Sequence, residues 1–393
     1  MREDFLVFGS PVVDEAEIAE VVGSLRSGWI GTGPKVHRFE RMLEEYVGVP
    51  HVRCVSSCTA ALILGMEVLG IGPGDEVLVP AMTFVASANA VEHTGATPVF
   101  VDSEPGTGLI DLDAAAAAVT ERTSAIMPVH LSGRPVDMDR LTAFRDRHGL
   151  LVVEDAAHAL GAEWAGRRIG GHGHLTAYSF YVTKNITTIE GGALATDDFE
   201  VAAAVESLSL HGLSLGAWQR FSDKGFKHYE VMKPGYKFNM TDVQAALGVH
   251  QLPRLDGWID ERAELWERYD ELLAGLPLRT PPPPESGMRH ARHLYQVEID
   301  SEAAITRDEA LDFLTSQRIG AGVHYRGVHL HPYYRERYSI DPDSLPVATH
   351  ISNTTLSLPL SPKVTERDQL DVASALGRGL TGARGRVANR AAV

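Results

Sequence analysis

The chain has few cysteines, no long apolar run and no excess of positive charge. Its only two cysteines, Cys54 and Cys58, cannot build a disulfide framework, and their spacing without a second pair is a poor zinc site. No stretch reaches the length of a membrane span, and no apolar region of a signal peptide follows the acidic N-terminus. The formal net charge of −16 argues against nucleic acid or an anionic membrane as a partner. We therefore expect a protein of the reducing cytoplasm that binds neither.

What the chain does contain is an alternation of short apolar runs and helical segments from residue 51 onward. The runs show no period-2 alternation, which is typical of strands buried on both faces. Strands are expected at 52–55, 76–79, 97–101, 125–129, 150–153, 176–181 and 193–196, with helices between them at 59–69, 85–93, 111–119 and 137–148. This βαβ pattern predicts an α/β fold, with a three-layer α/β/α domain around a mostly parallel sheet.

The C-terminal part has fewer strands and no βαβ run. Helices are expected at 241–252, 256–273, 307–318 and 366–377, and strands at 294–299 and 323–325. We predict a large domain at 1–253, which includes an N-terminal arm and a helix at 14–25, and a smaller α+β domain at 254–380. Residues 381–393 are expected to form a disordered tail. A basic segment at 220–237 is either an anion-binding patch or a solvated loop.

One lysine, Lys184, lies in the loop between the apolar runs 176–181 and 193–196, just ahead of Gly191 and Gly192. A lysine in such a loop is either a solvated charge or a buried amine held for chemistry. A buried amine with a lowered pKa can form a Schiff base, which is how lysine acts as a covalent catalyst. Taken alone, Lys184 favours the solvated interpretation.

Polar groups at neighbouring strand ends favour chemistry, because ligands collect at the carboxyl ends of parallel strands. Asp155 is either a helix N-cap or a carboxylate that keeps a pyridinium nitrogen protonated, and His158 faces the same ligand or merely packs. Residues 55–59 are either a capping motif or a phosphate cradle. Phe84 is core or a stacking face for an aromatic ring, and Ser179 offers a hydroxyl. Together with the lysine, these groups match the requirements of pyridoxal phosphate.

Seven segments carry a resemblance to a known family, namely 31–34, 56–62, 80–87, 154–161, 184–192, 235–247 and 329–335. Through them the chain resembles the DegT/DnrJ/EryC1/StrS family of sugar aminotransferases, which have the aspartate aminotransferase type fold of pyridoxal-phosphate-dependent transferases (fold type I). The chain departs from the family pattern at Cys58, where the family usually has glycine, and at Ile189, where a small residue is common.

The resemblance implies a role for each matching residue. Lys184 would bind the aldehyde of pyridoxal phosphate covalently and act as the catalytic acid and base, and Asp155 would pair with the ring nitrogen. Phe84 would stack on the ring, and His158 would lie near its phenolic oxygen. The phosphate would be held by Cys58, Thr59 and Ser179, and by Asn239 and Lys237 of the partner subunit in a homodimer with shared active sites. The sugar pocket would be lined by Thr32, Gly33, His324, Tyr325 and His329.

The implied reaction moves an amino group from L-glutamate, through the pyridoxamine phosphate form of the cofactor, to the keto group of a nucleotide-linked sugar. The segments 235–242 and 184–188 resemble members that act at C4, so we expect a dTDP-4-keto-6-deoxyhexose as substrate and a role in amino-sugar biosynthesis for a secondary metabolite or a cell-surface glycan. A 3-keto sugar or a cyclitol is the alternative within the family.

Three alternatives come from other classes of protein. A regulatory or sensor protein could keep the fold without the activity. A nicotinamide oxidoreductase lacks a complete glycine fingerprint here. A zinc site at His324, His329 and His331 lacks the spacing of known ligand motifs, so no metal is expected.

Overall fold

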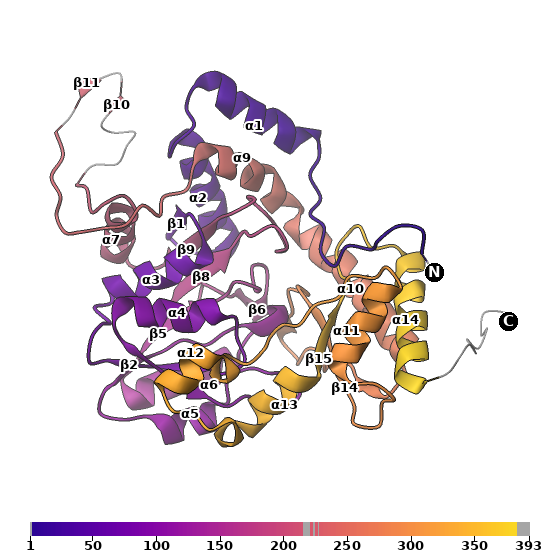
Figure 1. Cartoon of the computed structure of the whole chain (residues 1–393). Coiled ribbons are helices and arrows are strands. Elements are labelled where there is room, and N and C mark those ends of the chain that lie inside the picture. The colour runs from indigo at the N-terminus through magenta and orange to yellow at the C-terminus, as the bar shows by residue number, and fades with distance from the viewer. Residues whose placement is uncertain (1, 215–220, 223–224, 227, 383–393) are drawn as a thin grey trace.

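A seven-stranded sheet forms the centre of the computed structural model, which describes residues 2–214, 221–222, 225–226 and 228–382 (Figure 1). The strand order is β1-β9-β8-β5-β4-β2-β3. Neighbouring strands are parallel except at β9, which is antiparallel to both β1 and β8. The strands are β1 (His51–Val55), β2 (Glu76–Pro80), β3 (Thr97–Val101), β4 (Thr123–Ile126), β5 (Leu151–Asp155), β8 (Leu175–Ser179) and β9 (Gly192–Thr196). The predicted mostly parallel sheet is confirmed, and each of the seven strands overlaps a predicted run.

Helices cover both faces of this sheet and make two separate cores (Figure 1). In β2, Leu78 packs into one core and its neighbours Val77 and Val79 pack into the other, which explains why the run shows no polar alternation. One face is covered by α3 (Cys58–Val68), α4 (Val85–Thr94) and α7 (Phe199–Ser209), and the other by α2 (Pro34–Val47), α5 (Leu112–Ala118), α6 (Met138–His148) and α9 (Asp242–Gln251). The three-layer architecture is therefore confirmed.

Two of these helices, α2 and α7, were not predicted. The start of α2 has Pro34 at its first position, and the carboxylate of Asp242 accepts the N–H groups of Lys35 and Val36 at 3.1 and 3.0 Å. Asp242, about 200 positions away, therefore caps this helix, and the sequence around Pro34 does not reveal that cap. Helix α1 (Glu15–Ser27) lies beside α9.

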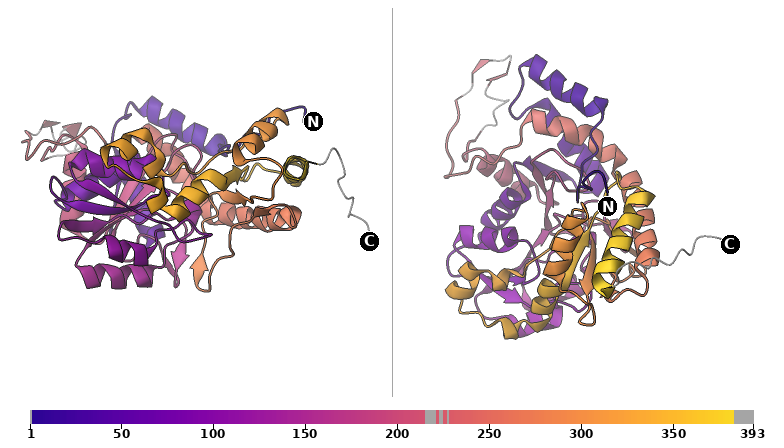
Figure 2. Two further views of the ribbon diagram at one scale, coloured as in Figure 1. Left: turned by 60° about the horizontal axis from the view of Figure 1, so that its bottom comes forward. Right: turned by 45° about the vertical axis from the view of Figure 1, so that its right-hand side comes forward.

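A third core belongs to the C-terminal part, which lies beside the large sheet (Figure 2). Its sheet has the antiparallel order β12-β14-β15, with β12 at Leu278–Arg279, β14 at Tyr295–Ile299 and β15 at Thr355–Leu358. Its helices are α10 (Leu255–Leu273), α11 (Arg307–Ser316) and α14 (Glu366–Thr381). This confirms a smaller α+β part, while the boundary at residue 254 stays a prediction.

The two parts exchange segments. The N-terminal arm pairs with the C-terminal part, because Leu6 forms a bridge with Ile319. In the other direction, α12 (Pro332–Arg337) and α13 (Pro346–Thr354) return to the large sheet, where Ile351 packs near Met82. The remaining elements are β6 (Glu163–Trp164), β7 (Arg167–Arg168), β10 (Phe221–Ser222), β11 (Gly225–Phe226), β13 (Met288–Arg289), and the short 3-10 helices η1 (Leu131–Gly133), η2 (Leu252–Arg254), η3 (Val328–Leu330) and η4 (Pro342–Ser344).

The predicted strand at 323–325 is wrong. Gly322 makes a single bridge with Ser357, after which the chain leaves the sheet and forms a loop. Of the predicted tail, residues 383–393 lie outside the described residues, as do residues 220, 223, 224 and 227 of the basic segment. Among the helices of the described residues, none combines the length and apolarity that crossing a membrane requires.

Candidate active site

A cavity of about 440 Å³ opens at the carboxyl ends of the central strands, within the size range of small-molecule sites. It brings together residues that are up to 270 positions apart in the chain. Nine predicted site residues line its wall, together with Ser57 next to them. The nine are Cys58, Thr59, Phe84, Asp155, His158, Ser179, Lys184, His324 and Tyr325.

Lys184 reaches the cavity from the loop between β8 and β9. The loop is closed by backbone hydrogen bonds, from Phe180 N–H to the Gly191 carbonyl and from Lys184 N–H to the Tyr181 carbonyl, both 2.9 Å long. Burial lowers the pKa of Lys184 to about 8, although Cys58 and Asp155 nearby act in the opposite direction. A lowered pKa makes the neutral, nucleophilic amine available near physiological pH.

Asp155 is the last residue of β5, and its carboxylate is almost fully buried. One oxygen, Oδ2, accepts a hydrogen bond from the Ser87 hydroxyl at 2.8 Å. The other, Oδ1, accepts the Ala157 N–H at 3.0 Å and lies 3.9 Å from the Cys58 thiol. Asp155 therefore both accepts a backbone N–H, as an N-cap residue does, and lines the cavity. A buried carboxylate with so few donors can accept a further cationic N–H.

The start of α3 supplies the backbone groups of a phosphate cradle. Ser57 caps the helix by accepting the Ala60 N–H at 3.1 Å, whereas the first N–H groups of a helix have no partner within it. Cys58 and Thr59 occupy this first turn in the cavity wall, and an anion is stabilised there by the helix dipole. Strand β9 approaches closely, because a Cβ on Gly192 would lie 2.5 Å from the Cys58 nitrogen.

Aromatic side chains form the other side of the cavity. Phe84 is 53% exposed, and its ring centroid lies 5.5 Å from that of Tyr325. His158 accepts the Ser132 N–H at Nδ1 over 3.1 Å, and its Nε2 lies 2.9 Å from the Tyr325 hydroxyl oxygen. Burial lowers the pKa of His324 to about 4, and Nδ1 of this ring lies 2.9 Å from the Ser357 hydroxyl.

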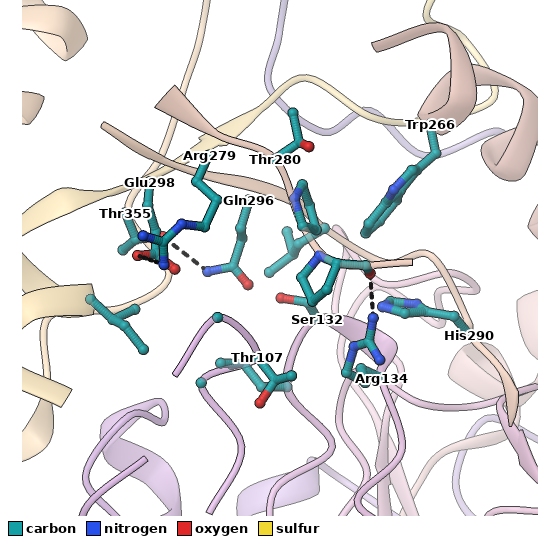
Figure 3. A pocket seen from close by; sticks show the side chains of 17 residues that line it. Thr107, Ser132, Arg134, Trp266, Arg279, Thr280, His290, Gln296, Glu298 and Thr355 are labelled. Atoms are coloured by element: carbon teal, nitrogen blue, oxygen red, sulfur yellow. Dashed lines mark hydrogen bonds and ion pairs between the residues drawn. The ribbon is translucent and has the colours of Figure 1, made fainter. Parts of the chain in front are cut away.

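Behind Ser132 lies a second, small pocket of about 40 Å³ between the two parts of the chain. Ser132, Arg134, Trp266 and His290 lie around it (Figure 3). The guanidinium of Arg134 is buried and donates to the Pro283 carbonyl at 2.9 Å. Ser132 lines this pocket, and its N–H donates to His158, which lines the larger cavity.

Five predicted site residues lie outside the larger cavity. His329 is fully buried, with Nε2 2.8 Å from the Thr349 hydroxyl. Gly33 packs against Trp29, since a Cβ there would lie 1.6 Å from the indole nitrogen. The other three form a hydrogen-bonded group, in which Lys237 Nζ donates to Asn239 Oδ1 at 2.6 Å and Asn239 Nδ2 donates to the Thr32 hydroxyl at 2.8 Å.

The sequence analysis missed His293. This residue lines the cavity, and its ring centroid lies 4.6 Å from that of His158. Burial and the charge of Lys184 lower the pKa of His293 well below its usual range. The available signal was a histidine directly ahead of a predicted strand, but Lys184 and the strand-end residues of the site lie more than 100 positions earlier in the chain.

A model of the DegT/DnrJ/EryC1/StrS aminotransferase family matches residues 11–377. The chain belongs to this family. SpsC, a spore coat polysaccharide biosynthesis protein of Bacillus subtilis, is 47% identical over 95% of this chain and 97% of its own.

Solved structures agree with this assignment. The PMP form of the putative sugar aminotransferase Spr1654 from Streptococcus pneumoniae superimposes with a TM-score of 0.89 at 34% identity, over 95% of this chain and 98% of its own. PseC of Helicobacter pylori, an aminotransferase involved in the biosynthesis of pseudoaminic acid, gives a TM-score of 0.89 at 26% identity, over 96% of this chain and 99% of its own. This member of the family is therefore a pyridoxal-phosphate-dependent sugar aminotransferase of fold type I.

The residues present in this aminotransferase fit pyridoxal phosphate. The cavity offers, for a phosphate, the first N–H groups of α3, which have no partner within the helix, together with an exposed aromatic face at Phe84 and the buried carboxylate of Asp155. Lys184 adds an amine with a lowered pKa in the same cavity. These are the complementary groups for an anion, an aromatic ring, a cationic ring nitrogen and an aldehyde.

Proposed function

We propose that this aminotransferase moves an amino group from L-glutamate to C4 of a nucleotide-linked 4-keto-6-deoxyhexose, with dTDP as the nucleotide. Family membership supports a nucleotide-linked sugar and glutamate as the two substrates. The names of two relatives, one in spore coat polysaccharide and one in pseudoaminic acid biosynthesis, support an amino sugar as the product. The observation that carries the transamination is the position of the Lys184 amine in one cavity with Asp155 and the start of α3. The choice of C4 rests on the resemblance of the segments 184–188 and 235–242 to members that act there.

Bound pyridoxal phosphate supplies an electron sink for the carbanion that forms when a proton leaves carbon. Lys184 Nζ takes the proton from the α-carbon of glutamate and, in the second half of the cycle, delivers a proton to the amine-bearing carbon of the sugar. A pKa of about 8 suits both directions at neutral pH. Asp155, held by Ser87 and the Ala157 N–H, keeps the ring nitrogen cationic.

The two helix-start residues Cys58 and Thr59 hold the phosphate together with Ser179 in this proposal, and Phe84 stacks on the ring. His324 and Tyr325 contact the sugar. His329 lies outside the cavity, so we assign it no contact with the sugar.

The group formed by Thr32, Lys237 and Asn239 points to a homodimer with shared sites. It lies outside the cavity of its own chain, and Lys237 is exposed, so we propose that it reaches the phosphate in the partner subunit. Mixing inactive Lys184→Ala and Asn239→Ala chains tests this idea. Recovery of activity in the mixture is expected, and activity no higher than that of the two separate variants would contradict shared sites.

A product assay tests the substrate. The holoenzyme is incubated with L-glutamate and matched panels of 3-keto and 4-keto nucleotide sugars, and the position of the new amine is read by NMR. Amination at C4 is expected, with Lys184→Ala as the inactive control. Amination at C3, or of a cyclitol ketone alone, would replace the proposed substrate with the alternative within the family.

A further inference from the structure

Three residues far apart in the sequence form one hydrogen-bond chain in the cavity wall. The Ser132 N–H donates to His158 Nδ1 over 3.1 Å, and His158 Nε2 lies 2.9 Å from the Tyr325 hydroxyl oxygen. A backbone N–H can only donate, so His158 Nδ1 carries no proton. The His158 ring is therefore a neutral imidazole with its single proton on Nε2.

This assignment fixes the direction of the second hydrogen bond. Since Nε2 carries the proton, it donates, and the Tyr325 oxygen accepts. The hydroxyl proton of Tyr325 is therefore not used by His158. Among the described residues, His158 is the only hydrogen-bond partner of this hydroxyl, and the Tyr325 side chain lines the cavity.

The donor end of the chain is held in place by its backbone. Ser132 has φ of 59°, a left-handed conformation that is uncommon for residues other than glycine. Its carbonyl accepts the N–H groups of His293 and Leu294 at 3.1 and 3.4 Å, which ties the loop to the start of β14. With its carbonyl held on the far side, the Ser132 N–H stays directed at His158.

The electrostatics agree with this direction. Burial and the charge of Lys184 lower the pKa of His158 well below its usual range, so the ring stays neutral. Burial and the Asp155 carboxylate raise the pKa of Tyr325 above its usual range, so the phenol keeps its proton.

We propose that Tyr325 is a hydrogen-bond donor held for an acceptor oxygen in the cavity, and that His158 is the positioning residue that makes it a donor. The ligand chemistry is an oxygen that accepts hydrogen bonds and has no proton to give. Two groups carry such an oxygen, namely the carbonyl of the keto sugar and the phenolic group of the cofactor. The first of these rests on the proposed function. Tyr325 donates a hydrogen bond without transferring its proton, and it stabilises the charge that develops on the oxygen.

The tautomer of His158 can be read directly. In the ¹⁵N-labelled holoenzyme, with the resonances assigned by comparison with His158→Phe, Nδ1 is expected to be unprotonated and Nε2 protonated at neutral pH. A proton on Nδ1, or an imidazolium ring, would overturn the proposal, because the hydrogen bond to Tyr325 would then lose its direction.

Substitution tests the donor and separates its two acceptors. Tyr325→Phe keeps the ring and removes the proton. If the acceptor is the keto sugar, kcat/KM for that sugar falls about 100-fold, as after loss of one preorganised donor, and the visible spectrum is unchanged. If the acceptor is the cofactor, the pH midpoint of its visible absorbance shifts by a unit or more. His158→Phe should change the same readout in the same direction by a smaller factor, because the hydroxyl remains but is no longer directed.

The matched control is Tyr338→Phe, which removes a hydroxyl that donates to Glu92 outside the cavity and should leave both readouts unchanged. In Tyr325→Phe, a kcat/KM within twofold of wild type together with an unchanged pH midpoint of the visible absorbance would overturn the proposal. Should no keto sugar in the panel be aminated, the proposed function fails, while the tautomer and the spectral midpoint still decide the direction of the hydrogen-bond chain.

Discussion

The buried carboxylate of Glu154 gives the sharpest stability prediction. Glu154 lies next to Asp155 on β5 and is fully buried. Its Oε2 lies 2.8 Å from His130 Nε2 and its Oε1 lies 2.9 Å from His174 Nδ1. His130 Nδ1 accepts the Val136 N–H at 3.0 Å, so the His130 proton is on Nε2 and is donated to Glu154.

The hydrogen bonds from His130 and His174 determine how much the Glu154 carboxylate contributes to folding stability. Burial alone would raise the pKa of Glu154, but the bonds from His130 and His174 outweigh it and lower the pKa from 4.5 to about 2. A shift of that size corresponds to about 3 kcal/mol of folding stability. In Glu154→Gln the charge is gone and the amide NH₂ faces an imidazole N–H, so we expect the free energy of unfolding at pH 7 to fall by about 3 kcal/mol.

The sign of the pH dependence follows from the depressed pKa. The folding stability that the Glu154 carboxylate contributes is fully present above pH 4.5, where Glu154 is ionised in the unfolded state as well. This stability is lost as the pH falls toward 2. The difference between wild type and Glu154→Gln should therefore shrink from about 3 kcal/mol at pH 7 to about 1.5 kcal/mol at pH 3.

Equilibrium urea unfolding of the holoenzyme at both pH values measures this difference. The matched control is Glu285→Gln, whose carboxylate is 62% exposed and lies 3.8 Å from Arg134, and which should change stability by less than about 1 kcal/mol. A loss below about 1 kcal/mol for Glu154→Gln at pH 7, or a difference that does not shrink toward pH 3, would refute the reasoning.

Four further predictions concern the cavity and its loop. Asp155→Ala should raise the barrier of the glutamate half-reaction by several kcal/mol, and a near-normal single-turnover rate would rule out its role at the ring nitrogen. Gly192→Ala places a Cβ 2.4 Å from the Ser57 carbonyl carbon, so the start of α3 must move; we expect Kd for pyridoxal phosphate to rise at least tenfold, and an unchanged Kd would contradict the cradle. Ile189 has φ of 72°, which costs a branched residue about 1–2 kcal/mol, so Ile189→Gly should raise the free energy of unfolding by about 1 kcal/mol; a loss of stability would argue against this strain. In the cofactor-free protein, amine modification of Lys184 should have its midpoint near pH 8, and a midpoint above 10 would show that the amine is solvated.

Much of the fold could be predicted because its strands are buried on both faces. The run at 76–79 is continuously apolar for that reason, and Leu78 and its neighbours do face opposite cores. Helix α2 was not predicted, although its sequence has helical signals: Pro34 stands at its first position, Gly48 follows its end, and its buried apolar residues recur at helical spacing. Residues 323–325 have the composition of a strand, but the pairing ends with the single bridge at Gly322, and the chain then turns to the cavity.

Part of the candidate site could also be predicted from the sequence, and part of it could not. Asp155, Lys184 and the start of α3 could be placed together because strand ends of one parallel sheet meet at the same edge. His293 reaches the cavity from outside that sheet, and no sequence rule says which loop of the C-terminal part faces which strand end. His329 was expected to line the sugar pocket, yet it is buried, with Nε2 2.8 Å from the Thr349 hydroxyl.

The central claim is that the amine of Lys184 holds the cofactor covalently. Borohydride reduction of the holoenzyme fixes such a bond, and peptide mapping by mass spectrometry then locates the label. The account predicts a single pyridoxyl group on the peptide that contains residue 184, and none in Lys184→Ala. A label on another lysine, or no label in the wild-type holoenzyme, would contradict it.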